Sequence, residues 1–362
     1  MHSDPLPALP LDTNPVWRSY RGGRILRAFR GQPDTGDDHF PEDWLASTVA
    51  ARNGPHTQGP DEGISSICRN GQKITVGQLL MTDPESTWGN RSRGKKTSPG
   101  LGVLIKLLDA SVRLQVQAHP DRQFVRRYLS GDAGKTECWY ILSTRGPAQV
   151  YLGFQRPPSR AEWKRLLQEQ DVAEILACFE PIPVQAGDCL VVPAGVPHAI
   201  GAGIFMIELQ EPSDWVVRCE ASNGELVLPE AQRYMGLGLD ACLDVFDYQA
   251  YPLTEVRTRF QQPPRIVAST AAFTEEQIIG QRYEEFFRLR RVRGTGPARW
   301  QGDEIMVLIM TKGEGLLCSG GSEQLVRQGQ TWLLPGCVSE WRWGAQTSDW
   351  EILLAQPPHE VR

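Results

Sequence analysis

Short runs of apolar residues, each about as long as a β-strand, alternate with turn residues along much of the chain. Between Leu114 and Ile207 these runs are rich in β-branched and aromatic residues, and residues 286–355 return to the same pattern. Such runs, bounded by glycine, proline and small polar residues, are typical of strands. Many short strands at close spacing favour a sandwich or barrel, so the pattern predicts a mainly β chain with two jelly-roll-like β-barrels in tandem.

Two segments interrupt this pattern. Residues 158–180 carry apolar residues at helical spacing, and Ser159 followed three residues later by Glu162 predicts a capping box. We therefore expect a helical insertion near 159–180, between two strands of one barrel. Residues 82–100 are polar, basic and glycine-rich. We interpret them as a solvated surface loop, with a lid over a site as the alternative.

The length of the chain predicts two domains, since 362 residues exceed one ordinary domain. The segment 248–265 is interpreted as a linker. We expect a first domain at 1–240, which contains the helical insertion, and a second region at 241–362, which consists of the linker and a C-terminal domain.

Charge and composition argue against several classes of protein. The net charge is −5 and the isoelectric point about 5.8, so no global positive field attracts nucleic acid or an anionic membrane. No apolar stretch is long enough to predict a membrane span, and residues 1–15 do not have the pattern of an export signal. The eight cysteines are scattered without a CxxC pair, which favours reduced thiols in a cytoplasmic protein.

Two of the six histidines, His119 and His198, lie in strand-like segments. His119 follows Gln117 by two residues, so both side chains are expected on one face of a strand. Glu137 stands at the start of the next strong strand, where a carboxylate is costly unless a partner pairs with it. These residues are candidates for one polar site.

His198 adds a spacing signal. The order Gly187, Pro193, Gly195, His198 matches the second cupin motif, in which glycine and proline turn a strand so that the histidine points into the barrel. Two imidazoles, one carboxylate and one amide oxygen form a suitable zinc site with an open position. A lone histidine is more often structural, but the combination favours a metal site.

An ordered set of motifs carries a resemblance to a known family. The chain contains QVQAHP, GKTECWYIL, GDCLVVPAGVPHAIGAG, MIELQ and SDWVVR in this order, preceded by KLLDA at residues 106–110. It thereby resembles the type I mannose-6-phosphate isomerases of the cupin superfamily, densely over residues 99–220 and loosely over 15–90. The resemblance implies a zinc-dependent aldose–ketose isomerase that interconverts mannose 6-phosphate and fructose 6-phosphate through a cis-enediol.

The resemblance also assigns roles to residues. It implies one zinc ion per chain, no other cofactor, and the metal ligands Gln117, His119, Glu137 and His198. It places proton carriers or substrate contacts at Lys106, Lys135 and Glu208, and an arginine that faces the substrate at Arg218. Simpler explanations remain open at this point: a turn position for Lys135, an edge position for Lys106, a solvent-facing position for Glu208, and a salt bridge between Asp214 and Arg218.

The chain departs from the family pattern at two positions. Gln115 stands where much of the family has a serine that contacts the phosphate, and after Arg218 the next cation is Arg233 rather than a lysine. Two alternatives follow: an isomerase of another sugar, phosphorylated or not, and a non-catalytic sugar-binding bicupin with zinc as a clamp.

The second barrel is expected to bind no metal. Gly329 and Pro335 repeat the spacing of Gly187 and Pro193, but Glu340 stands at the position of His198. One glutamate without histidines is a poor zinc site, so this barrel is interpreted as structural. The sequence does not indicate the oligomeric state.

Overall fold

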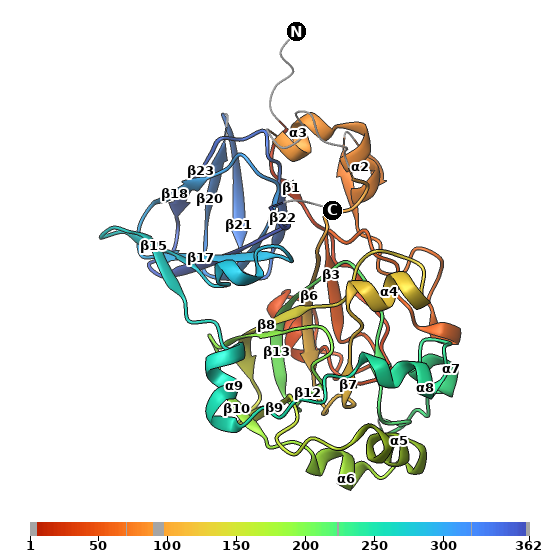
Figure 1. Cartoon of the computed structure of the whole chain (residues 1–362). Helices are drawn as coiled ribbons and strands as arrows, with labels where there is room; N and C mark the ends of the chain where they lie inside the picture. The colour runs from red at the N-terminus through yellow and green to blue at the C-terminus, as the bar shows by residue number, and fades with distance from the viewer. Residues whose placement is uncertain (1–5, 70, 90–97, 223, 320, 360–362) are drawn as a thin grey trace.

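Four antiparallel sheets, arranged as two β-units, form the framework of the computed structural model, which describes residues 6–69, 71–89, 98–222, 224–319 and 321–359 (Figure 1). The N-terminal unit has a six-stranded sheet of order β11-β8-β13-β6-β3-β2 and a five-stranded sheet of order β10-β9-β12-β7-β14. The six strands are β11 (Cys189–Val192), β8 (Glu137–Thr144), β13 (Ile204–Gln210), β6 (Leu104–Ala110), β3 (Glu42–Leu45) and β2 (Pro15–Val16). The five are β10 (Ile182–Val184), β9 (Ala148–Leu152), β12 (His198–Ile200), β7 (Gln117–Ala118) and β14 (Val217–Arg218).

The C-terminal unit pairs a seven-stranded sheet, β1-β22-β19-β24-β17-β16-β15, with a four-stranded sheet, β18-β23-β20-β21. The first contains β1 (Leu9–Pro10), β22 (Thr331–Leu334), β19 (Met306–Lys312), β24 (Trp350–Gln356), β17 (Arg288–Gly294), β16 (Phe273–Gln277) and β15 (Arg265–Ser269). The second contains β18 (Ala298–Gln301), β23 (Glu340–Ala345), β20 (Glu314–Ser319) and β21 (Ser322–Arg327). A small hairpin joins β4 (Ser66–Arg69) to β5 (Gln72–Thr75). Strand β1 therefore ties the start of the chain to the C-terminal unit.

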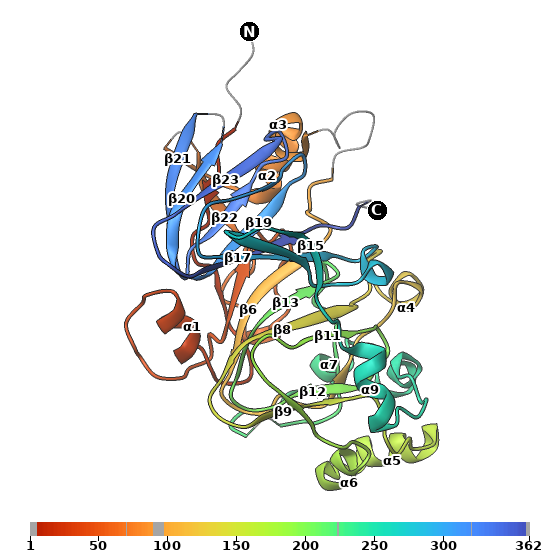
Figure 2. The same ribbon diagram turned by 90° about the vertical axis from the view of Figure 1, so that its left-hand side faces the viewer.

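The two units pack back to back through a shared apolar layer. On β13, Ile204 and Met206 face the interior of the N-terminal unit, whereas Ile207 and Leu209 face a cluster that also contains Leu353 of β24. Strands buried on both faces lose the polar alternation of a half-exposed sheet, which explains why all seven residues of β13 are buried. Each such aliphatic side chain contributes roughly 1.5–3 kcal/mol on burial. In Figure 2 the C-terminal unit lies above the N-terminal sheets.

Helices cover the remaining faces. The helical insertion is present as α5 (Arg160–Glu169), which Ser159 caps by accepting the Glu162 N–H, and α6 (Val172–Ala177). Both pack on the outer face of the five-stranded sheet. The other helical segments are α1 (Arg24–Phe29), α2 (Val76–Thr82), α3 (Pro84–Trp88), α4 (Arg122–Tyr128), α7 (Glu230–Arg233), α8 (Leu239–Cys242), α9 (Leu253–Phe260), η1 (Gly54–His56), η3 (Leu243–Val245) and η4 (Gln281–Tyr283).

The structure adds detail to two segments that were interpreted from their local composition, 248–265 and 82–100. Within the segment that we interpreted as a linker, α9 forms and buries Val256 and Phe260, because these residues share one helix face and meet the core of the N-terminal unit. The first part of the polar segment 82–100 contains α3. Residues 90–97 of this segment lie outside the described residues, and the alternative of a lid falls on them. The mainly β, two-unit cupin-like fold with helical insertions is confirmed. Among the described residues, no helix is long and apolar enough to span a membrane.

Candidate metal centre and active site

Strand alternation brings the predicted site residues to the interior of the N-terminal unit. Glu137 opens β8, and Lys106 of β6 lies directly opposite Glu208 of β13 in the six-stranded sheet. On the facing five-stranded sheet, Gln117 of β7 lies opposite both His198 of β12 and Arg218 of β14. Directly opposed residues in a sheet project to the same face, so three neighbouring strands present these side chains together. These residues are up to 112 positions apart in the sequence, and the pairing of strands within the two sheets brings them together.

A buried cluster of three ligating side chains forms the floor of the site. His119, Glu137 and His198 offer ligand atoms that all lie within 4.8 Å of one another. His119 Nε2 is 3.1 Å from Glu137 Oε2, and His198 Nε2 is 3.3 Å from Glu137 Oε1. Trp139 Nε1 donates a hydrogen bond of 3.0 Å to Glu137 Oε1 and orients the carboxylate.

The hydrogen bonds of the two imidazoles fit a metal site. His119 Nδ1 lies 3.1 Å from the carbonyl oxygen of Trp215, and His198 Nδ1 lies 2.8 Å from that of Val196. A carbonyl accepts only, so each Nδ1 carries the proton and each Nε2 presents a lone pair to the cluster. His198 Nε2 is buried without a hydrogen-bond partner among the described residues. Burial, followed by the charge of Lys135, lowers the pKa of His119 to about 3, which keeps the ring neutral as a ligand must be.

Lys135 joins this cluster to the adjacent cavity. Its Nζ lies 3.1 Å from Glu137 Oε2 and 2.9 Å from His119 Nε2, and its side chain also lines the cavity. Burial alone would raise the pKa of Glu137, but Lys135 and the two histidines hold it well below its usual range. Lys135 lies in the turn segment just before β8, as the alternative explanation had it, but it is only 5% exposed.

A second buried ion pair stands beside it. Lys106 Nζ lies 2.7 Å from Glu208 Oε2 and 3.7 Å from Glu42 Oε2. Burial lowers the pKa of Lys106, yet the two carboxylates outweigh it and raise the pKa, so this lysine stays protonated. Burial raises the pKa of Glu208. The explanations of a snorkelling edge lysine and a solvent-facing glutamate are wrong, because Lys106 is 2% and Glu208 3% exposed.

The N-terminal segment supplies residues that the sequence reasoning missed. Arg18 lies 3.0 Å from Glu42 and 3.2 Å from Asp214, and Tyr20 donates to Glu42 at 2.6 Å. Asp214 therefore pairs with Arg18, and the predicted alternative of a salt bridge to Arg218 does not hold. Glu42 is the first residue of β3, as Glu137 is of β8, but β3 reads EDWL and so offers no isolated carboxylate on an apolar strand as a signal.

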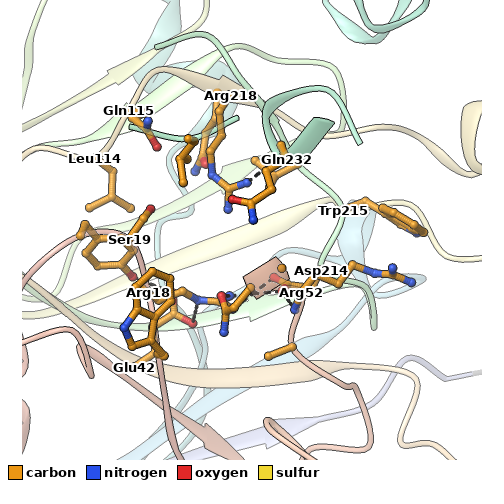
Figure 3. Close-up of a pocket in the computed structure, with 18 of the residues that line it drawn as sticks. Arg18, Ser19, Glu42, Arg52, Leu114, Gln115, Asp214, Trp215, Arg218 and Gln232 are labelled. Atoms are coloured by element: carbon orange, nitrogen blue, oxygen red, sulfur yellow. Dashed lines mark hydrogen bonds and ion pairs between the residues drawn. The ribbon is translucent and has the colours of Figure 1, made fainter. Parts of the chain in front are cut away.

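A cavity of about 480 Å³ lies beside the ligating cluster, and Lys106, Lys135 and Glu208 are among the residues that line it. This volume is in the range of small-molecule sites. Figure 3 shows Arg18 between Glu42 and Asp214 on one wall, with Arg218 and Gln115 on the opposite wall. Burial lowers the pKa of Arg218 to about 10, and Nη1 donates a long hydrogen bond of 3.5 Å to the Gln232 carbonyl. Gln115 lines the cavity, but its Nε2 donates to the carbonyl of Glu220 at 2.8 Å.

Several known proteins are similar in sequence to this chain. No family model matches the chain. A mannose-6-phosphate isomerase of Streptococcus mutans is 27% identical over 263 residues, which cover 72% of this chain and 76% of that protein. A probable mannose-6-phosphate isomerase of Bacillus subtilis is 37% identical over 157 residues, 43% of this chain and 49% of that protein.

Solved structures show the same fold. The mannose 6-phosphate isomerase of Bacillus subtilis superposes with a TM-score of 0.76 at 19% identity and covers 97% of this chain and 100% of its own. A putative mannosephosphate isomerase from Archaeoglobus fulgidus superposes with a TM-score of 0.70 at 18% identity, over 98% and 99% of the two chains.

Proposed function

Because the chain belongs to the mannose-6-phosphate isomerase family, we propose that it interconverts mannose 6-phosphate and fructose 6-phosphate with the help of a divalent metal. The observation that carries the proposal is the buried group of His119, Glu137 and His198, which Lys135 connects to the neighbouring cavity. Gln117, opposite His198 on the next strand, is proposed as the fourth ligand. We propose zinc as the metal, one ion per chain, since imidazole, carboxylate and amide donors suit it.

The reaction moves a proton between two adjacent carbons. In the open-chain aldose, a base takes the proton from C2, a cis-enediolate forms, and the proton returns to C1 while a hydroxyl proton moves between the two oxygens. A metal ion, when bound, supplies a Lewis acid for the sugar oxygens, and its charge favours the neutral form of a neighbouring lysine. We propose that Lys135 Nζ carries the proton, because this side chain alone among the predicted catalytic groups touches both His119 and Glu137 and also lines the cavity.

Lys106 and Glu208 have a different proposed role. The carboxylates of Glu208 and Glu42 keep Lys106 protonated, so it is unsuited to remove a proton from carbon. A fixed ammonium in a buried, water-poor site stabilises negative charge as it develops on the enediolate oxygens. Glu208 holds Lys106 in this position and contacts the sugar from the same wall.

Arg218 is the proposed anchor of the phosphate. It lines the cavity opposite Arg18, and within the described residues no carboxylate lies at ion-pair distance from it. A guanidinium offers planar paired donors that match phosphoryl oxygens. Arg18 is unsuited to this role, because its donors are engaged by Glu42, Asp214 and Asn53.

One observation favours the second candidate, an isomerase of an unphosphorylated sugar. The side-chain amide of Gln115 donates a hydrogen bond to the Glu220 carbonyl. Arg233 does not line the cavity, because it stacks on Tyr234 with its guanidinium 4.6 Å from the ring centroid. The site therefore has fewer phosphate donors than the family pattern implies.

We also propose that residues 1–240 form the catalytic domain, that residues 241–362 supply a linker and a metal-free domain, and that the enzyme works in the cytoplasm. All proposed site residues precede position 219, and all eight cysteines are free thiols, as is usual in a reducing compartment.

One assay tests the function. Zinc-loaded protein is given mannose 6-phosphate and free mannose in parallel, and ketose formation is measured. We expect turnover of the phosphorylated sugar. Turnover of free mannose alone would favour the second candidate. Absence of turnover with any aldose, together with binding of the sugar, would replace the enzyme by a binding protein.

A further inference from the structure

Asn53 has an unused hydrogen-bond donor in the wall of the cavity. It precedes the short helix η1 and is 7% exposed. Asparagine at such a position usually caps the helix with its side chain, but here the side chain makes no capping bond. It points away from its own helix and lines the cavity instead.

Arg18 fixes which way this amide faces. Arg18 Nη1 donates a hydrogen bond of 3.0 Å to Asn53 Oδ1. A guanidinium has only donors, so rotating the amide by half a turn would place two donors against each other. Arg18 in turn is held by Glu42 and Asp214. Nδ2 must therefore point away from Arg18, and among the described residues it has no hydrogen-bond partner although it is buried.

The backbone holds Asn53 in this place. Gly54 has φ 57°, and a Cβ built on it would lie 1.9 Å from Gln232 Nε2. The loop thus packs against the side chain of Gln232, and its left-handed backbone conformation at this position favours glycine. Gln232 lies on the Arg218 side of the cavity (Figure 3), so the loop of Asn53 reaches the side chain of a residue on the opposite wall.

A buried donor without a partner is costly, and a ligand oxygen would relieve that cost. We propose that Asn53 is a substrate-binding residue, whose Nδ2 donates a hydrogen bond to a hydroxyl oxygen of the sugar; the class of ligand rests on the function proposed above. Arg18, the cation that contacts Asn53, is engaged by the carboxylates of Glu42 and Asp214. Its charge is therefore already balanced, so this part of the wall suits an uncharged hydroxyl better than a phosphate dianion.

The experiment replaces the donor and keeps the acceptor. In Asn53→Asp a carboxylate oxygen still accepts from Arg18, while the N–H donors are lost. Calorimetric binding of mannose 6-phosphate and of free mannose is measured on zinc-loaded protein, beside turnover and thermal melting. We expect Kd and KM to rise by roughly tenfold or more for both ligands, with the melting temperature nearly unchanged. Gln58→Glu is the matched control, since it makes the same change at an exposed position of the same loop; both constants should stay at wild-type values.

The outcomes separate this inference from the proposed function. Unchanged Kd and KM in Asn53→Asp would overturn the inference and leave the isomerase intact. A loss confined to the phosphorylated ligand would overturn the hydroxyl assignment. Wild-type protein that binds both sugars without turning them over, and loses binding in Asn53→Asp, would support the inference and refute the isomerase. Failure of wild type to bind either sugar would overturn both. If Asn53→Asp fails to fold, Asn53→Ala removes the donor as well, and Kd and KM should again rise for both ligands.

Discussion

Two strands at equivalent places in the two β-units show how one fold gives two different interiors. Strand β11 ends just before Pro193 and β22 just before Pro335, and β12 and β23 each begin five residues after that proline, at His198 and Glu340. In β12 the first residue points into the unit. In β23 the first residue is exposed, and Trp341 points inwards instead. Because side chains alternate along a strand, a phase difference of one residue exchanges the two faces completely.

The interiors differ accordingly. The N-terminal unit encloses ionisable groups and a cavity, whereas the C-terminal unit is filled by tryptophans, namely Trp300, Trp332, Trp341, Trp343 and Trp350. Four of these indole nitrogens are buried without a partner among the described residues. Large aromatic rings fill the interior of the C-terminal unit, whereas the N-terminal unit keeps a cavity that has room for a ligand. Its seven-stranded sheet also covers the outer face of β6, β8 and β13, which keeps the strands of the site buried on both sides.

The metal should distinguish the two units most sharply. We expect His198→Ala to lose bound zinc and all measurable isomerase activity, because it removes one of the clustered ligand atoms. Glu340→Ala, the equivalent change in the C-terminal unit, should keep wild-type metal content and activity. Metal analysis of both purified variants is the measurement. Full zinc content in His198→Ala would place the metal elsewhere.

Lys135→Met should separate catalysis from metal binding. Loss of a proton-transfer group costs ~100- to 10,000-fold in rate, and a clamp that only binds zinc has no use for this lysine. We therefore expect turnover to fall by that factor while zinc content and melting temperature stay nearly constant. Lys73→Met, at an exposed position of β5, is the control. Equal activity of the Lys135 variant and wild type would remove Lys135 as the proton carrier.

Arg218→Ala should have a smaller effect, restricted to the phosphorylated substrate. A charge-assisted hydrogen bond contributes enough that its loss raises KM roughly 10- to 100-fold. Zinc content and fold should persist. The measurement is the KM for mannose 6-phosphate in steady-state kinetics. Arg299→Ala, at an exposed position of β18, is the control. An unchanged KM would mean that the phosphate binds elsewhere.

Trp343→Ala tests the structural role of the C-terminal unit. Removing a buried indole should lower the free energy of unfolding by about 3–5 kcal/mol. The turnover number of the folded protein should change little, since Trp343 lies in the C-terminal core, outside the site. Urea unfolding beside kinetics measures both quantities, and Arg342→Ala, an exposed neighbour on the same strand, serves as control. A large fall in turnover number would instead couple this core to the site.

Acid should weaken the ionic interior of the N-terminal unit. Burial would raise the pKa of Glu42, but Arg18 and Lys106 outweigh it and lower the pKa from 4.5 to about 2. A depressed folded-state pKa contributes stability above pH 4.5, and that stability is lost as the pH falls towards 2. Glu42→Gln should therefore flatten the fall of unfolding free energy with pH in this window. An identical pH slope in wild type and variant would contradict the shift.

Much of the fold and part of the site could be predicted from the sequence, because strand periodicity is a local property. Alternation alone placed Gln117 and His119 on one face, and motif spacing turned His198 inwards, so the buried group with Glu137 was expected before the sheets were known. The helical insertion was likewise expected from its cap and its spacing. Helix α9 was not expected within the segment interpreted as a linker, since a short amphipathic stretch among prolines becomes helical only when a core receives Val256 and Phe260.

Tertiary structure decided which distant groups meet and which of their atoms remain free. The sequence contained Arg18, Asn53 and Asp214 but gave no reason to bring them together, because their contacts depend on the pairing of β3 with β6 and on the close approach of Gly54 to Gln232. The protonation states of buried groups also depend on packing. Burial and neighbouring charges keep Lys106 charged and His119 neutral. Local alternation fixes the direction of a side chain. Its partners, and hence its chemistry, arise from the sum of long-range contacts that places one sheet against another.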